Sequence, residues 1–346
     1  MAEVCPSGLL HGSMLNLGVV TREQYYADAS GILGRLWWLR RRSRISLQLL
    51  RGGGIPPSTE DLHLFDLLMS RIWLSNGVKR TTERARFAGL DRDILPLLES
   101  RFKRNTPLLV HDWAASNCIT SAEWASLLFE TFPNASVTAS DLTLYIVEVS
   151  TANGDIFITE RTGEPLQFIK PPFVVRLNPP EPKPLIINHL LCRLARRKLA
   201  RMSQHISEMA DLLDTHEQTE QIGLRLRKIS LIHPEAEHLS AHDHRFVIRK
   251  HSVFQPLGAP AHVIRSMNIF NRSYFPPQRL IEGARAVALS LQPGGIWIVG
   301  RSACEGSGTL SASVFTKKEN SFELVERFGG GSEIESLVLD SLRSLN

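Results

Sequence analysis

Apolar residues recur every three or four positions through the first hundred residues, which is the spacing of one face of an α-helix. Residues 20–50 are read as helical, and the glycines and prolines that follow end this stretch. Further helices are predicted at about residues 60–75, with Leu62, Phe65 and Met69 on one apolar face, and at about residues 90–102. The pattern therefore predicts an N-terminal helical domain over residues 1–104.

From residue 105 the pattern changes to that of an α/β domain. A short apolar run ends at Asp112, residues 121–132 have helical periodicity, and a second short apolar run ends at Asp141. This order of strand, helix and strand is typical of a βαβ unit with parallel strands and a right-handed crossover. The same pattern resumes later, with strand candidates at residues 246–248, 262–265 and 296–299, a helix at 277–291, a β-hairpin at 310–328 and a final amphipathic helix.

Between these two α/β stretches lies a segment of another character. Residues 154–177 contain short apolar bursts separated by Gly and Pro, which predict a group of short strands. A basic helix from about residue 185 to 206 and a more polar helical stretch to about residue 227 follow. We therefore expect an α/β domain over residues 105–346 that carries a β/helical insertion over residues 151–240.

Composition and cysteine usage narrow the class of protein. With 43% apolar and 22% charged residues, the chain has the composition of a folded globular protein and not of a disordered one. The four cysteines are far apart in sequence, which favours reduced thiols in a cytoplasmic protein over a disulfide framework or a structural zinc site. Neither a signal-peptide pattern nor an apolar run of about 18 residues is present.

The net charge of +5 is concentrated in two blocks that contain no acidic residue, residues 32–59 and 182–207. Basic amphipathic helices that carry Trp or Leu bind anionic membrane surfaces. Residues 35–51 and 185–201 are therefore candidates for contact with an anionic membrane, and nucleic acid is a less favoured partner. The alternative is that both apolar faces pack on the protein itself and the arginine stems cover their flanks.

Candidate ligand-binding residues follow three of the expected strands. In open α/β sheets, ligands bind beyond the carboxyl ends of the strands. The stretch 112–117 after the first strand is rich in small residues, and Asp141 ends the second strand, where a carboxylate can accept two hydrogen bonds from a ribose diol. The stretch 267–271 is small and polar after a later strand. Together these features predict a nucleotide-type ligand at one edge of the sheet.

These stretches, with Pro293-Gly294-Gly295 before the last parallel strand, resemble the class I S-adenosylmethionine-dependent methyltransferases, and within them the chemotaxis-receptor methyltransferase (CheR) type. The resemblance covers about residues 85–150 and 243–328. That family has Ala-Cys-Ser-Thr-Gly-Glu-Glu after its first strand, where this chain has residues 114–120. The family's glycine is Cys118 here, its two glutamates are absent, and its Arg before Asn268 is Met267.

The resemblance implies a Rossmann-like class I methyltransferase sheet, S-adenosylmethionine as cofactor, and methyl transfer by direct displacement to an unidentified acceptor. It also implies a set of cofactor-binding residues: Asp112, Ala114, Ser116 and Asn117 for the methionine part, Asp141 and Leu142 for the ribose and adenine, Ser252 and Val253 at the adenine edge, and Asn268 and Ile269 facing the sulfonium.

No catalytic residue is assigned from the sequence, because a general base is recognised by geometry before residue type. His251, Tyr274 and Arg301 are the candidates near the strand edge. The histidines 238, 242, 244 and 251 match no metal-binding spacing, so no metal site is predicted.

The alternative function is a module that kept the methyltransferase fold for binding or regulation and lost catalysis. Cys118, Met267 and the missing acidic pair favour this alternative, whereas Asp112, Asp141 and Asn268 favour the enzyme.

Overall fold

The structure of the chain is a computed structural model. It describes residues 18–20, 44–46, a few positions between 62 and 75, and then residues 82–170, 173–178, 186–302, 310–319 and 321–341. The chain divides into two compact units. The first consists of residues 1–81 with 145–234, and the second of residues 82–144 with 235–346. Each unit is considered by itself below.

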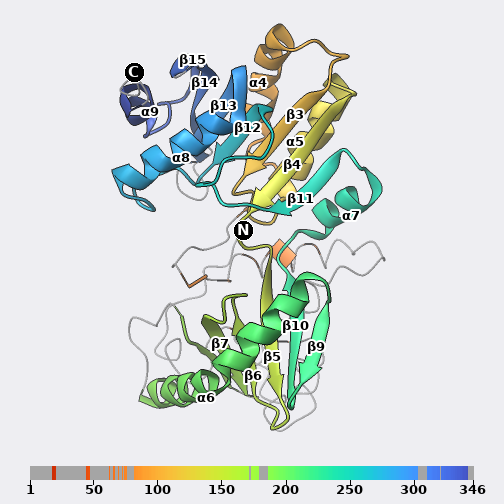
Figure 1. The fold of residues 1–346 in the computed structure, drawn as a ribbon, viewed down its shortest axis with the longest axis vertical. Helices are drawn as coiled ribbons and strands as arrows, with labels where there is room; N and C mark the ends of the chain where they lie inside the picture. Colours follow the sequence, from red (N-terminus) through yellow and green to blue (C-terminus); the bar gives the residue numbers. More distant parts are fainter. Residues whose placement is uncertain are drawn as a thin grey trace. The chain divides into compact units, whose positions relative to one another are not determined.

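The second unit is built on a seven-stranded sheet in the order β11-β4-β3-β12-β13-β14-β15 (Figure 1). The first five strands of that order run parallel, and β14 and β15 form an antiparallel hairpin at the edge. The fold class that the sequence predicts, an α/β Rossmann-like sheet with a C-terminal hairpin, is confirmed. The strands are β3 (Leu108–Trp113), β4 (Ala135–Asp141), β11 (Phe246–Lys250), β12 (Ala261–Met267), β13 (Leu291–Ser302), β14 (Leu310–Lys317) and β15 (Phe322–Phe328).

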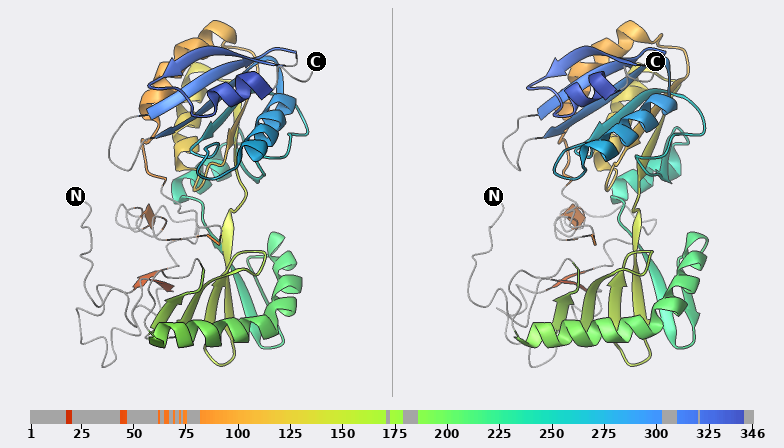
Figure 2. Two further views of the ribbon diagram at one scale, coloured as in Figure 1. Left: turned by 90° about the vertical axis from the view of Figure 1, so that its left-hand side faces the viewer. Right: turned by 60° about the vertical axis from the view of Figure 1, so that its left-hand side comes forward.

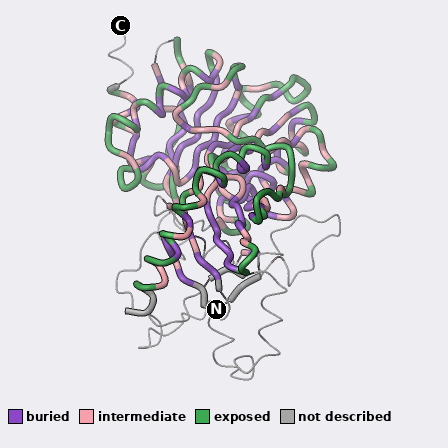
Figure 3. Tube along the Cα trace, turned by 60° about the horizontal axis from the view of Figure 1, so that its bottom comes forward, coloured by how far each residue is buried: buried purple, intermediate pink, exposed green. Residues whose placement is uncertain are grey.

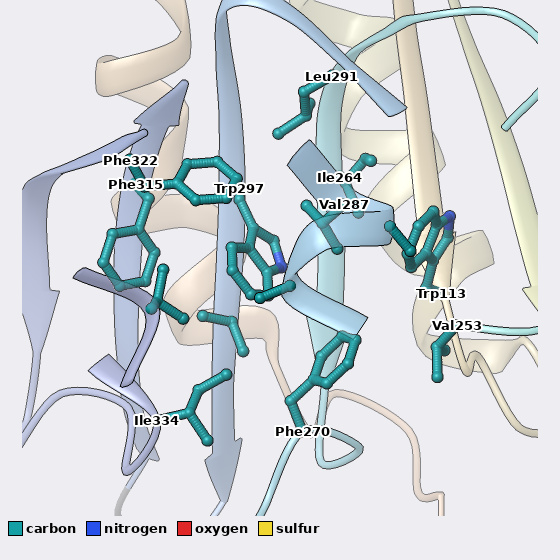
Figure 4. Packing of buried hydrophobic residues seen from close by; sticks show 14 of the residues in the cluster. Trp113, Val253, Ile264, Phe270, Val287, Leu291, Trp297, Phe315, Phe322 and Ile334 are labelled. Carbon is teal, nitrogen blue, oxygen red and sulfur yellow. The ribbon is translucent and has the colours of Figure 1, made fainter. Parts of the chain in front are cut away.

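Helices cover both faces of this sheet, because successive residues of a strand point to opposite sides. On β3 the side chain of Asp112 contacts Ser121 of α5 (Ile119–Thr131), and Arg265 links it to α4 (Ala88–Arg101). Its neighbour Trp113 points to the other face. There Trp113 and Trp297 share a core cluster with α8 (Pro277–Ser290) and α9 (Glu335–Ser341), as Figure 4 shows. A short helix, α7 (Pro234–His242), precedes β11.

The first unit contains a six-stranded antiparallel sheet in the order β8-β7-β6-β5-β10-β9. The long helix α6 (Ile186–Ala210) lies across one face of this sheet, and a 3₁₀ turn, η2 (Asp211–Asp214), follows it (Figure 2). The strands are β5 (Tyr145–Thr151), β6 (Ile156–Thr159), β7 (Pro165–Lys170), β8 (Phe173–Arg176), β9 (Gln218–Gln221) and β10 (Leu224–Ser230).

Both faces of this second sheet are buried. One face packs Phe157 and Phe168 against Leu199 and Ile206 of α6. The other face packs Ile146 and Ile158 against apolar residues of the N-terminal segment, namely Phe65, Met69 and Ile72. Buried segments accordingly run along the strands in Figure 3. The predicted apolar face of residues 60–75 is therefore part of this core.

Two boundaries differ from those expected. The N-terminal segment of the first unit ends at residue 81, whereas a boundary at 104 was expected. Residues 82–104 belong to the second unit, where Asp91 of α4 is ion-paired with Arg265 of β12. The insertion comprises residues 145–234 instead of 151–240, and it shares one unit with the N-terminal segment.

Two expected helices are also wrong in part. Residues 218–221 and 224–230 form strands β9 and β10, because Leu224 and Leu226 alternate with polar residues and pair with β5. Residues Arg44–Ser46 form β2, which pairs in parallel with β1 (Gly18–Val20), within the stretch expected to be helical. Apart from residues 44–46, the basic block 35–51 lies outside the described residues. Within the described part of the chain, no helix has the length and apolar character to cross a bilayer.

Candidate functional site

The order of the sheet places a topological switch point at the carboxyl end of β3. From β3 the chain proceeds to β4 on one side, while β12 pairs with β3 on the other side. Loops that leave the ends of β3 and β12 therefore diverge, and such a switch point is where open α/β sheets bind ligands. All predicted site residues lie at the carboxyl ends of β3 and β4 or in the loops that follow β3, β4, β11 and β12.

The loop after β3 has an unusual backbone. Ala114, Ser116 and Cys118 all have positive φ, at 57°, 56° and 63°. A left-handed conformation costs a non-glycine residue roughly 1–2 kcal/mol, so the surroundings must hold it in place. The Ala115 N–H donates to the Ser140 carbonyl at 2.8 Å, and the Cys118 N–H donates to the Ala115 carbonyl at 2.9 Å. Cys118 thus adopts the conformation typical of the glycine that it replaces in the resembled family.

Asp141, at the end of β4, fastens this loop. Its Oδ2 accepts the Ser116 N–H at 2.8 Å, and its Oδ1 accepts the Thr143 N–H at 2.9 Å. Both contacts join the carboxylate to backbone N–H groups of the surrounding loops. Leu142 beside it is 61% exposed. The structure therefore brings the loop after β3, Asp141 and Leu142 together.

Asp112 does not join this group through its side chain. Its Oδ1 and Oδ2 lie 3.1 and 2.6 Å from Nε and Nη2 of Arg265, and Oδ2 accepts the Ser121 hydroxyl at 2.5 Å. Asn117 is also fully buried, and its Oδ1 accepts the Ile119 N–H at 3.2 Å. Both side chains hold the start of α5 in place, and their contacts with a methionine moiety stay a prediction.

The buried acids around Arg265 have unusual electrostatics. Burial raises the pKa of Asp91 to about 6, although the hydrogen-bonded guanidinium of Arg265 opposes this shift. The pKa of Arg265 itself stays above its ordinary value, because the attraction of Asp112 and Asp91 outweighs the burial that would lower it. This cluster ties α4, β3 and β12 together behind the loop.

Asn268 directly follows β12. Like Ala114, Ser116 and Cys118, it has a positive φ, at 61°. Its side-chain Oδ1 accepts the Ser302 N–H at 2.9 Å, and its own N–H donates to the Gly300 carbonyl at 2.8 Å. The guanidinium of Arg86 donates to the Ser302 hydroxyl at 2.7 and 2.9 Å. Ile269 is partly buried against the core of α8. Arg86 was not foreseen, because nothing in its local sequence pattern indicates that it reaches the end of β13.

The residues after β11 divide between core and surface. Val253 is buried in one cluster with Trp113, whereas Ser252 is half-buried. The ring of His251 packs on the Trp113 indole with centroids 4.9 Å apart, and burial lowers the pKa of His251, so its neutral form is favoured. In the described part of the chain, Nε2 of His251 and Nε1 of Trp113 are buried without a hydrogen-bond partner.

The other two candidates for a catalytic role are Arg301 and Tyr274. Arg301 pairs with Glu333 at 3.0 Å, and the Tyr274 side chain is 46% exposed. Among the described residues, no group of three or more His, Cys, Asp or Glu side chains has the geometry of a metal site. The structure therefore assigns no general base.

Comparison with known proteins gives only distant similarities. No protein-family model and no curated protein matches the chain. Similar solved structures include the sugar N-methyltransferase KedS8 from Streptoalloteichus, with 10% identity, a TM-score of 0.31, and coverage of 75% of this chain and 78% of that chain. The mitomycin 7-O-methyltransferase MmcR has 9% identity, a TM-score of 0.30, and coverage of 72% and 43%.

A structure described as that of a sarcosine dimethylglycine methyltransferase from Galdieria sulphuraria has 9% identity and a TM-score of 0.29, with 61% of this chain aligned. The chain spans 45% of the length of that protein. At identities of 9–10% and TM-scores of 0.29–0.31, these similarities assign no activity to this chain.

Proposed function

We propose that the protein is a methyltransferase that uses S-adenosylmethionine and binds it at the carboxyl edge of the seven-stranded sheet. One observation carries the proposal: the strained loop after β3, with three left-handed non-glycine residues, is fastened to the carboxylate of Asp141 at the switch point of the sheet. Strained backbone of this kind is concentrated at ligand-binding and catalytic sites, where the surrounding structure maintains it.

The residues present at this edge fit the cofactor. Asp141 ends β4, where a carboxylate can accept hydrogen bonds from the two hydroxyl groups of a ribose, and the exposed side chain of Leu142 offers an apolar surface beside it. Ala114 and Ser116 are small, so a ligand can approach the backbone of the loop closely. On the other side of the switch point, the bond to Ser302 holds Asn268 in place.

The tasks of the protein in such a reaction are positioning and exclusion of water. S-adenosylmethionine, when bound, supplies an electrophilic methyl group, so the protein has mainly to align a nucleophile with it. Asp141 and the loop after β3 would hold the ribose and methionine parts. Asn268 and Ile269 would form the wall nearest the methyl group. A carboxylate acceptor needs no general base, in agreement with the absence of an assigned one.

The acceptor of a CheR-type enzyme is not part of the proposal. Cys118 and Met267 stand where that family has a glycine and an arginine, and the two glutamates after the loop are absent. A small molecule or a protein other than a chemotaxis receptor is therefore the acceptor that we propose.

Calorimetric titration with S-adenosylmethionine and S-adenosylhomocysteine tests the proposal. We expect the wild type to bind both, Asp141→Asn to bind more weakly, and Asp141→Ala to bind more than about tenfold more weakly, since a lost charged hydrogen bond costs about 1.5–3 kcal/mol. Asp93→Ala, at an exposed position of α4, is the matched control and should bind like the wild type.

Each result has a distinct meaning. If the wild type binds neither compound, the enzyme proposal fails, and a module that kept the fold for binding or regulation becomes the better description. If Asp141→Ala binds as tightly as the wild type, the ribose contact assigned to Asp141 is wrong.

A further inference from the structure

Helix α6 has two faces of very different character. Its inner face is buried against the six-stranded sheet through Ala195, Leu199, Ile206 and Met209. Its outer face is exposed to solvent and carries Arg193, Arg197 and Arg201 at intervals of one helical turn. Figure 2 shows α6 along the outside of the sheet of this unit.

Two leucines lie on the same outer face. Leu190 is 59% exposed and Leu194 is 48% exposed. Successive residues of a helix are about 100° apart, so Leu190, Leu194, Arg197 and Arg201 fall within one half of the helix circumference. The outer face therefore combines an apolar pair at one end with a stripe of arginines.

These arginines differ from two other arginines that the structure describes in the unit, Arg161 and Arg225. Arg161 is ion-paired with Asp211 and Asp214, and Arg225 lies 2.9 Å from Glu220. In the part of the chain that the structure describes, no acidic side chain pairs with Arg193, Arg197 or Arg201. The nearest acids in sequence are Glu181 and Glu208, because residues 182–207 contain none. Within the described residues, no ion pair therefore compensates the positive charge of this face.

Two basic residues of α6 have structural tasks and do not belong to this surface. Arg196 donates to the Leu177 carbonyl, and Lys198 pairs with Asp155, whose carboxylate is almost fully buried. These contacts fix the helix against the sheet, so the outer arginines project from a helix of fixed position. The part of this face from Leu190 to Arg201 contains no acidic residue, and the exposed Glu208 lies about two turns further along the helix. A rigid surface with leucines beside arginines is complementary to an anionic lipid surface, where leucines enter the headgroup boundary and arginines contact the phosphates.

We propose that the outer face of α6 (Leu190, Arg193, Leu194, Arg197 and Arg201) docks this protein on an anionic membrane surface. Nucleic acid is the weaker fit, because the apolar members of the face are leucines and not the aromatic side chains on which bases stack. The proposal is independent of methyl transfer, since it concerns the first unit alone.

Co-sedimentation of the full chain with lipid vesicles tests this proposal. We expect binding to vesicles of equal parts phosphatidylcholine and phosphatidylserine, weaker binding at high salt, and little binding to phosphatidylcholine alone. The triple variant Arg193→Gln/Arg197→Gln/Arg201→Gln should bind at least about tenfold more weakly. Leu190→Gln/Leu194→Gln should weaken binding while leaving its salt dependence in place.

The matched control is Arg285→Gln/Leu289→Gln on α8. It removes an exposed arginine and an exposed leucine that are likewise one turn apart, but on a helix that also carries Glu282. This variant should bind vesicles like the wild type. Circular dichroism should show that all variants remain folded, because every substituted side chain is exposed.

Several results would overturn the proposal. They are equal vesicle binding by the triple variant and the wild type, binding that does not depend on phosphatidylserine, and no binding by the wild type. Binding of single-stranded oligothymidine by the wild type but not by the triple variant, without vesicle binding, would assign the face to nucleic acid instead.

Discussion

Arg265 on β12 and Asp112 on β3 form a two-point ion pair in the interior of the sheet unit, with Nε–Oδ1 and Nη2–Oδ2 distances of 3.1 and 2.6 Å. Nη1 of the same guanidinium lies 2.6 Å from Asp91 of α4, and Nη2 also donates to the Thr120 carbonyl at 3.1 Å. The side chain of Arg265 is fully buried. One arginine therefore connects α4, the start of α5 and two strands directly behind the candidate site.

Arg265→Met should destabilise the protein severely. The substitution leaves the carboxylates of Asp112 and Asp91 buried without their cation, which typically costs about 3–5 kcal/mol. Urea denaturation measures the loss as a change in the free energy of unfolding. Arg225→Gln is the control, because Arg225 and Glu220 form an exposed pair whose loss costs no more than about 1 kcal/mol. A loss below about 1 kcal/mol for Arg265→Met would contradict this account.

Asp91→Asn should change how stability depends on pH. Burial raises the pKa of Asp91 to about 6 in the folded protein, against about 3.9 in an unfolded chain. Between these values the folded state binds the proton more readily, so the contribution of Asp91 to stability falls as the pH rises from about 4 to 6. Relative to the wild type, Asp91→Asn should therefore be more stable at pH 7.5 than at pH 4.5, by about 2–3 kcal/mol at most.

His111→Gln should change the pH dependence of stability in the opposite direction. Burial, aided by the charges of His251 and Arg249, lowers the pKa of His111 to about 4. The stability associated with neutral His111 is complete above its unfolded pKa of about 6.5 and is lost as the pH falls towards 4. His111→Gln should therefore gain stability relative to the wild type on acidification. Thermal unfolding of both variants over pH 4–8 measures the two slopes, and slopes of the same sign would contradict the assignment.

Cys118→Gly should be tolerated better than an ordinary glycine substitution in the same helix. Cys118 has φ 63°, so glycine removes a conformational cost of about 1 kcal/mol that offsets the loss of the buried thiol. Ala122→Gly, one turn later in α5, has no such compensation and should cost about 1–2 kcal/mol. Urea denaturation measures the free energy of unfolding of both variants. Cys118→Gly being as costly as Ala122→Gly would show that the loop is not strained at this position.

Gly283→Ala should disturb the packing of α8 behind Asn268. A Cβ at this position would lie 2.2 Å from the ring of Phe270, so the ring or the helix must move, and overpacking of this kind costs about 1–3 kcal/mol. Gly89→Ala in α4 meets open space and should instead stabilise the protein by about 0.5–1 kcal/mol. Thermal unfolding separates the two cases. Equal effects of the two substitutions would argue against close packing of α8 on Phe270.

The sequence alone predicted most of the sheet unit, because its evidence is local. The strands that contain Asp112 and Asp141, the helix between them and the terminal hairpin all follow from periodicity and turn residues over short windows. The sequence also singled out Asp141 as a candidate ligand-binding residue, because it stands at a strand end.

The tertiary structure alone decided which residues meet. Arg265 lies 153 positions from Asp112 and 174 from Asp91, and no local pattern indicates such a contact. The same holds for Arg86 and Ser302, and for the packing of Phe65 and Met69 on a sheet formed by residues 145–230. Helical periodicity identified an amphipathic helix at α6 but not which surface it would meet, whereas the sheet selected a face centred on Ala195 and Leu199 and left Leu194 exposed. Periodicity shows that a helix is amphipathic. Which of its residues become buried depends on the distant surface against which the helix packs, and only the folded chain forms that surface.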